Sequence, residues 1–309
     1  MHFSTFVATA LAATPLAASA VGTLGFAVGN TNADGSCKKQ ADFEADFEAI
    51  GSNTDSTLIR TYSSSDQFGN PCNTPSEVLA AAKSKGFKVL LGMWPDGGAY
   101  EKEKAPIIDA DIESYGDTVY GVTVGSEGMY RGTYHADDLI GWLDDMQKSL
   151  PNTLIGTADS WNCWANGTMD SIIKRPTKLI LANAFAYWQY QELSNATHTY
   201  FDDMAQALAH VQDVSGSLDE IKFMNGETGW PGDGGSDAGA AKASTDNEAS
   251  YWSSAVCGML SWGIDLFWFE AFDEPNKADA IGDNGKKASE RFWGSFDSDR
   301  KPKFNMRCS

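Results

Sequence analysis

The stretch Val119-Tyr120-Gly121-Val122-Thr123-Val124 predicts a strand that is buried on both faces, and Gly125-Ser126-Glu127-Gly128 follows it directly. β-Branched and aliphatic residues run almost continuously through it, which is typical of parallel strands covered by helices. Further runs of this kind occur along the chain. The eight predicted strands cover residues 23–28, 57–62, 88–93, 119–124, 154–158, 178–183, 220–224 and 264–269.

Amphipathic stretches lie between these runs. Apolar residues recur there at helical spacing, as in Leu139, Leu143, Met146 and Leu150, in Phe201, Met204, Leu208 and Val211, and in Trp252, Val256 and Leu260. Repeated alternation of strand and helix indicates parallel strands joined by crossover helices. An open doubly wound sheet is the alternative, but no G-x-G-x-x-G follows the first strand and no Walker motif occurs. We therefore predict an α/β fold with a single (β/α)8 TIM barrel over residues 21–309.

The formal net charge of the 309-residue chain is −19. Phosphate binding requires clustered Lys and Arg, so this balance argues against a nucleic-acid partner. It suits a soluble extracellular protein with a neutral substrate, and we expect a monomer. The chain contains ten Trp, which are available either as platforms for sugar rings or as core residues.

The first twenty residues predict a secretory signal peptide. An apolar run covers residues 6–18, and Ala18-Ser19-Ala20 gives the small-x-small pattern of a cleavage site before Val21. A buried N-terminal helix is the alternative. No later stretch stays apolar for the ~20 residues that a membrane span needs, so we expect a secreted protein without a membrane partner.

The five Cys of an exported chain predict disulfides, with one thiol left over or paired between chains. Their number permits several pairings. The sequons at Asn166 and Asn195 fit exported surface loops. The four His share no ligand-like spacing, and the acidic pair Asp233 and Asp237 suits a flexible loop better than a calcium site. We predict no metal and no cofactor.

Two predicted strands end beside a glutamate flanked by glycine. Glu127 follows the fourth strand, and Glu227 follows the seventh in Asn225-Gly226-Glu227-Thr228-Gly229-Trp230-Pro231. Active sites of these barrels lie at the carboxyl ends of the strands. Hydrolysis of a glycosidic bond needs two carboxyl groups, one to protonate the leaving oxygen and one to attack or to activate water. The alternative is that both are solvated glutamates at loop starts.

Several motifs resemble glycoside hydrolase family 17, and most closely its fungal cell-wall β-1,3-glucanases and β-1,3-glucanosyltransferases. They occur in the family's order over nearly all of residues 21–309. The motifs are Leu58-Ile59-Arg60-Thr61-Tyr62, Gly92-Met93-Trp94-Pro95-Asp96, Val124-Gly125-Ser126-Glu127, Asn183-Ala184-Phe185-Ala186-Tyr187-Trp188-Gln189, Glu227-Thr228-Gly229-Trp230-Pro231 and Phe267-Trp268-Phe269-Glu270-Ala271-Phe272-Asp273-Glu274-Pro275.

The resemblance implies a (β/α)8 fold and a retaining mechanism, with Glu127 as general acid/base and Glu227 as nucleophile. It implies further substrate-binding residues around them, with core packing an open alternative for the two tryptophans: Tyr62, Trp94, Ser126, Tyr187, Trp230, Glu270, Asp273 and Glu274. The implied substrate is β-1,3-glucan of the cell wall. Hydrolysis and transfer to another glucan stay open, with transfer slightly favoured. A non-catalytic glucan-binding wall protein is the alternative from another class, although both glutamates are present.

The sequence departs from the family pattern at three positions. Asn276 replaces a tryptophan, and Ala186 replaces a proline, both beside the expected cleft. Cys163 is a cysteine where the family predicts none, so we expect it to be the unpaired thiol. The expected disulfides are then Cys37–Cys72 and Cys257–Cys308.

Overall fold

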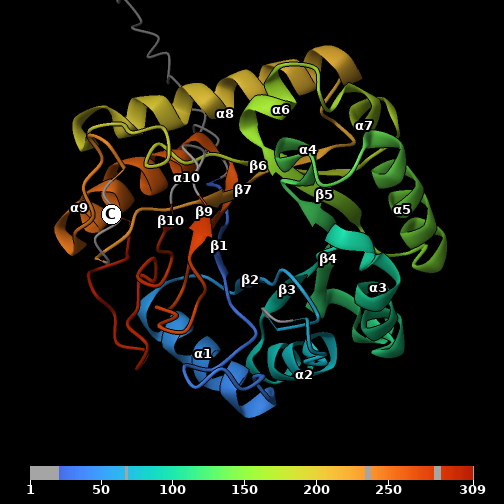
Figure 1. Cartoon of the computed structure of the whole chain (residues 1–309), viewed down its shortest axis with the longest axis horizontal. Helices are drawn as coiled ribbons and strands as arrows, with labels where there is room; N and C mark the ends of the chain where they lie inside the picture. Colours follow the sequence, from blue (N-terminus) through green and yellow to red (C-terminus); the bar gives the residue numbers. More distant parts are fainter. Residues whose placement is uncertain (1–20, 67–68, 234–237, 282–286, 309) are drawn as a thin grey trace, which may run out of the picture.

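The computed structural model describes residues 21–66, 69–233, 238–281 and 287–308. Eight parallel strands close into a barrel in the order of the sequence, β1 to β8, with β1 paired to β8 (Figure 1). The strands are β1 Leu24–Ala27, β2 Leu58–Arg60, β3 Lys88–Met93, β4 Val119–Ser126, β5 Ile155–Ser160, β6 Leu179–Asn183, β7 Lys222–Thr228 and β8 Asp265–Trp268. All eight predicted strands are confirmed, and with them the TIM barrel. The predicted signal peptide lies outside the described residues.

Helices surround the barrel and connect its strands (Figure 1). They are α1 Gln40–Asn53, α2 Thr74–Lys85, α3 Tyr100–Asp109, α4 Gly128–Arg131, α5 Ala136–Ser149, α6 Trp161–Ala165, α7 Asp170–Lys174, α8 Leu193–Ser215, α9 Thr245–Tyr251 and α10 Cys257–Trp262, with short helical turns η1 Asp96–Gly98, η2 Ile112–Thr118 and η3 Trp252–Val256. The three stretches with predicted helical spacing fall in α5, in α8 and in η3 with α10. Within the described part of the chain, no helix is both long and apolar enough to cross a membrane.

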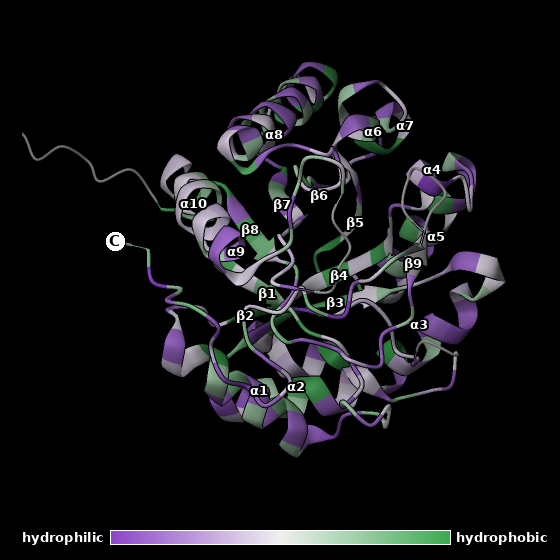
Figure 2. Cartoon of the chain, turned by 60° about the vertical axis from the view of Figure 1, so that its left-hand side comes forward, coloured by the Kyte–Doolittle hydropathy of each residue, from purple (hydrophilic) through white to green (hydrophobic). Residues whose placement is uncertain are grey.

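Two apolar layers hold the barrel together. Inside it, buried side chains fill the space between the strands: Leu58, Leu90, Ala158, Leu179, Leu181, Met224 and Phe267. A larger layer packs the outer faces of the strands against the helices, and hydrophilic residues gather on the outer helices and loops (Figure 2). This two-sided burial explains why the strands are almost continuously apolar.

The predicted disulfides are confirmed. Cys37 is bonded to Cys72, and Cys257 is bonded to Cys308, while Cys163 is a buried free thiol. The first bond joins the segment after β1 to the segment before α2. The second joins α10 to the C-terminal end of the described chain.

Strand β7 continues beyond its predicted end at residue 224. Asn225-Gly226 resembles a turn, but both residues belong to the strand, at an irregularity in its pairing with β6 and β8. The amide of the buried Asn225 donates to the carbonyl oxygens of Ala182 and Glu227, at 2.7 and 3.0 Å. Glu227 therefore lies within the last residues of β7. A small antiparallel pair, β9 Ala280–Ile281 and β10 Lys287–Ala288, was not predicted.

Glu248 on α9 is a buried carboxyl group whose oxygens have no hydrogen-bond partner among the described residues. Lys303 Nζ lies 3.9 Å away and is already bound to Asp273 at 2.7 Å. Burial raises the pKa of Glu248 well above its usual 4.5. Protonation thus stabilises the fold at acid pH, and this stability is lost as the pH rises from about 4.5 toward the folded-state pKa.

Replacing Glu248 by glutamine should therefore raise the free energy of unfolding at pH 7 by about 1 kcal/mol, with a smaller gain at pH 4. Urea unfolding at both pH values measures it. Glu103 on α3 is the matched contrast, because its buried carboxylate accepts from Ser63 Oγ, Ser64 N and Ser65 Oγ at 2.8–3.0 Å. Glu103→Gln should destabilise the protein by about 1–2 kcal/mol. Equal effects of the two changes would contradict this account.

Candidate active site

A cavity of about 1170 Å³ opens at the carboxyl ends of the strands. The ends of β4 and β7 contribute Ser126, Glu127 and Glu227 to its lining. Loops after β1, β2, β3, β6 and β8 supply most of the remaining wall. This is the end of the barrel at which active sites of the fold lie, so the cavity is the candidate active site.

Glu127 lies on a sharp turn between β4 and α4. Its own φ is 58°, in the left-handed region, and Gly125 before it has a φ of 77°. The ring of Tyr134 packs against this turn so closely that a Cβ on Gly128 would lie 2.0 Å from it. Asp159, which is buried at the end of β5, accepts hydrogen bonds from the backbone N–H groups of Met129 and Tyr130 at 3.1 and 3.2 Å. The turn is thus fixed from two sides.

Both oxygens of the Glu127 carboxyl group contact side chains of the described residues. Oε1 accepts from Asn183 Nδ2 at 3.0 Å, and Oε2 lies 3.4 Å from the Arg131 guanidinium. Burial raises the pKa of Glu127 to about 7, and the negative charge of Glu227 adds to the rise, while Asn183 and Arg131 oppose it. This carboxyl group is therefore half protonated near neutral pH.

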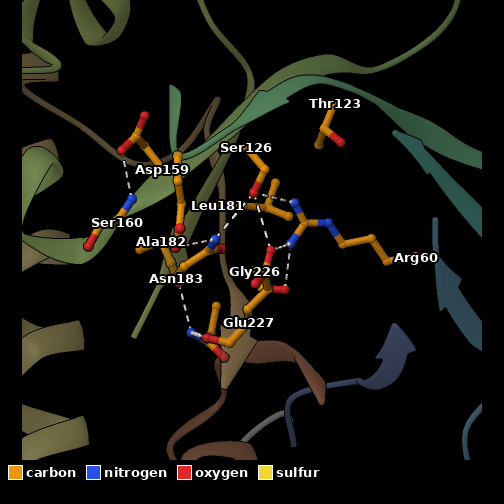
Figure 3. Close-up of polar contacts among 12 residues, drawn as sticks. Arg60, Thr123, Ser126, Asp159, Ser160, Leu181, Ala182, Asn183, Gly226 and Glu227 are labelled. Carbon is orange, nitrogen blue, oxygen red and sulfur yellow. Dashed lines mark hydrogen bonds and ion pairs between the residues drawn. The ribbon is translucent and has the colours of Figure 1, made fainter. Parts of the chain in front are cut away.

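The Glu227 carboxylate has a different environment. Its Oε1 lies 3.1 Å from the Arg60 guanidinium and accepts from Ser126 Oγ at 3.2 Å (Figure 3). Arg60 is 1% exposed and also donates to the Gly226 carbonyl at 2.7 Å. An arginine is always charged in proteins, so it supplies a permanent positive charge beside Glu227.

Ser126 and Asn183 connect the two carboxyl groups. Asn183 Nδ2 donates to Glu127 at 3.0 Å and lies 3.3 Å from Ser126 Oγ, which in turn donates to Glu227. The strand ends of β4, β6 and β7 meet here with the buried arginine of β2 (Figure 3). Glu127, which holds a proton near neutral pH, therefore lies close to Glu227, which is paired with a cation. Two carboxyl groups in such different environments can take the separate roles of acid and nucleophile.

The acidic residues after β8 line the cavity but are bound to lysines. Lys277 Nζ lies 3.0 and 2.9 Å from the oxygens of Glu270, 3.4 Å from Glu274 and 3.8 Å from Glu290. Burial and the charge of Glu274 raise the pKa of Glu270 well above 4.5, and Lys277 opposes the rise. Asp273 accepts from Lys303 Nζ at 2.7 Å. Sequence reasoning missed Lys277 as a member of this group.

The expected aromatic residues divide into two groups. Tyr62 and Trp94 line the cavity. Tyr187 and Trp230 do not: both are fully buried, with ring centroids 5.0 Å apart, and Trp230 Nε1 donates to the Lys242 carbonyl. For Trp230 the core alternative holds, and the expectation that Tyr187 lines the cleft is corrected, because its ring packs behind the cavity wall.

Further lining residues lie in the quoted motifs but were not selected from the sequence. Phe185, Trp188 and Phe269 line the cavity. In the strand-six motif, Trp188 faces the cavity whereas its neighbour Tyr187 is buried. The sequence offered one signal for Arg60, which is a charged residue within a predicted apolar strand. Such a residue is rarely buried without a partner.

Within the described ranges, no cluster of His, Cys, Asp and Glu is arranged to hold a metal ion. Asp237, one of the two residues weighed for calcium, lies outside these ranges.

A family model described as the BtgE/BtgC glycoside hydrolase domain matches residues 25–294. A glucan 1,3-beta-glucosidase from Arthroderma benhamiae is 46% identical, and the match covers 100% of this chain and 98% of that protein. A protein of the same name from Saccharomyces cerevisiae is 36% identical over 100% of this chain and 99% of its own length.

Solved structures of glycoside hydrolases also match the chain. A glycoside hydrolase family 17 β-1,3-glucanosyltransferase from Rhizomucor miehei matches with a TM-score of 0.75 and 25% identity, over 93% of this chain and 98% of that one. An active-site mutant of that enzyme in complex with laminaritriose gives a TM-score of 0.76. The chain therefore belongs to the BtgE/BtgC glycoside hydrolase family, which confirms the resemblance of its motifs to glycoside hydrolase family 17 and makes it a glycoside hydrolase.

Proposed function

We propose that this protein is a retaining enzyme that cleaves β-1,3-glucan and transfers the fragment to another glucan or to water. The observation that carries the proposal is the linked pair Glu127 and Glu227, one with a pKa near 7 and the other beside Arg60. Retention requires carboxyl groups about 5–5.5 Å apart. The short chain of contacts through Asn183 and Ser126 supports such a close pair.

The first step breaks the glycosidic bond. Glu227 attacks the anomeric carbon and forms a glycosyl ester, while the proton of Glu127 passes to the leaving oxygen. Loss of the negative charge on Glu227 removes one cause of the raised pKa of Glu127, which favours the carboxylate that the next step needs.

The second step releases the sugar. Glu127 takes a proton from the acceptor hydroxyl, whose oxygen attacks the anomeric carbon and frees the Glu227 carboxylate. Water as acceptor gives hydrolysis, and a sugar hydroxyl gives a new linkage. Tyr62, Trp94, Ser126, Glu270, Asp273 and Glu274 line the cavity in which the donor glucan would lie.

The substrate class rests on the relatives. Two are named glucan 1,3-beta-glucosidases, and a structural neighbour was solved with laminaritriose. A secreted, monomeric enzyme at the cell wall is consistent with this substrate and with the predicted signal peptide. A non-catalytic glucan-binding protein is not favoured, because both carboxyl groups and the groups that polarise them are in place.

Incubating the purified protein with one pure β-1,3-linked glucose oligomer should give products both shorter and longer than the starting oligomer by mass. Shorter products alone would assign water as the working acceptor. In the same reaction, NMR should find newly formed reducing ends first as the β-anomer. An initial α-anomer would contradict retention, and an unchanged oligomer would contradict the activity.

A further inference from the structure

Arg131 connects three parts of the cavity wall. It lies on α4, one turn after Glu127, and its guanidinium is 3.4 Å from Glu127 Oε2. The same group donates to the Ser126 carbonyl at 2.6 Å and lies 3.4 Å from Asp96 of η1. Its Cζ stands 4.8 Å from the centroid of the Trp94 ring. An arginine with four such neighbours is held in one position even though it is one-third exposed.

The Arg131–Trp94 contact indicates a role for Trp94 other than supporting a sugar ring. An aromatic ring supports a sugar through its face, but one face of Trp94 is covered by the guanidinium. Trp94 and Arg131 both line the cavity, so the stacked pair forms its surface there. The ring is thus placed to hold a cation beside Glu127.

We propose that Arg131 is a positioning residue that holds the Glu127 carboxyl group toward the cavity, and that Trp94 is the platform that keeps Arg131 in place. The proposal rests on the function proposed above, in which Glu127 is the acid/base. Asn183 restrains one carboxyl oxygen and Arg131 the other, so loss of Arg131 frees the carboxyl group to rotate about the Asn183 contact.

The charge of Arg131 has a second effect. The charged and titratable groups that face Glu127 or Arg131 come from several elements. They are Glu227 of β7, Asp159 of β5, Asp96 of η1, Tyr134 after α4, Cys163 of α6, Tyr62 after β2 and Glu290 after β10. Of these groups and Arg131, it is Arg131 that brings a positive charge into direct contact with Glu127. It lowers the pKa of Glu127 against the larger effects of burial and Glu227. Its removal should let the acid form persist to higher pH.

Arg131→Met tests both effects. We expect kcat/KM on a β-1,3-linked oligomer to fall roughly tenfold through lost orientation. The alkaline limb of its pH profile should move upward by roughly half a pH unit. Arg131→Lys keeps the positive charge but lacks the planar group that stacks on Trp94. Its alkaline limb should therefore stay near that of the unchanged enzyme, while its kcat/KM should fall by less than that of Arg131→Met.

Two further variants separate this role from others. Trp94→Leu should reproduce part of the upward shift, whereas a sugar platform would raise KM and leave the limb in place. Lys174→Met is the matched control, because Lys174 forms an i,i+4 pair with Asp170 at the same 3.4 Å, away from the cavity. It should leave the profile unchanged.

An Arg131→Met enzyme with an unmoved alkaline limb would overturn the proposal, whatever its rate. A movement of the limb to lower pH would overturn it as well. Failure of the underlying function is visible separately, because then a Glu127 variant would retain full activity. Thermal unfolding of each variant shows whether a lower rate reflects lost fold, and the limb position is independent of how much enzyme is active.

Discussion

Replacing Glu227 by glutamine is expected to lower kcat/KM on a β-1,3-linked oligomer about ten-thousandfold or more. Glutamine keeps the size of the side chain and an oxygen that accepts from Arg60 and Ser126, but it carries no negative charge to attack the anomeric carbon. The fold should survive. Product formation by mass and thermal unfolding measure the two expectations.

Glu48→Gln is the control for Glu227→Gln, since Glu48 pairs with Lys85 on the outside of α1 and should be replaceable without loss of rate. A smaller variant tests the assigned role directly. Glu227→Ala leaves space beside the anomeric carbon, so added azide should restore turnover of a substrate with a good leaving group and give a product of the opposite anomeric configuration. Unchanged activity of Glu227→Gln would refute its role as nucleophile.

Replacing Glu127 by alanine is expected to lower kcat/KM by roughly 10²–10⁴-fold on an oligomer, whose leaving group needs a proton. The loss should be much smaller on an aryl glucoside with an acidic leaving group, because that bond breaks without protonation. Rates on the two substrates measure the difference. Equal losses on both would point to damaged structure instead of a missing acid.

The pH dependence gives a second measurement on Glu127. Its pKa is raised to about 7, and the protonated form is the active one in the first step. The kcat/KM of the unchanged enzyme should therefore fall as the pH rises through about 7. Glu127→Gln, which cannot titrate, should lose this limb. A limb that persists in the glutamine variant would assign it to another group, such as Asp159, whose pKa burial raises to about 6.

The barrel could be predicted from the sequence because its strands are buried on both faces. That burial leaves an unbroken apolar run, and β3 begins and ends at its predicted residues. The end of β7 was the difficult case. Asn225-Gly226 has the composition of a turn, but the pairing of Asn225 with Ala182 of β6 and Leu266 of β8 places it within the strand.

The sequence predicted the two strand ends that carry Glu127 and Glu227, but not the side chains that contact these two carboxyl groups. Position along the chain fixes which residues reach the cavity end of the barrel, and Glu127 and Glu227 follow from it. The direction of a side chain in an irregular loop does not follow from position along the chain. The sequence therefore could not tell that Trp188 lines the cavity and that Tyr187 is buried behind it. Apart from Arg131, four residues after Glu127, the partners of the carboxyl groups come from other strands, as Asn183 is 56 residues from Glu127 and Arg60 is 167 residues from Glu227. Such contacts leave no local periodicity.

The Cys37–Cys72 bond has a consequence for ligand binding. It joins two loops that line the cavity, and Asn30 further ties them by donating to the carbonyls of Ser63 and Ser65. Free loops lose conformational entropy when a ligand orders them, but here the covalent crosslink has removed that freedom in advance. The ordering cost of association then falls on the saccharide, so stiffening the oligomer in its bound shape should improve affinity more than stiffening the protein.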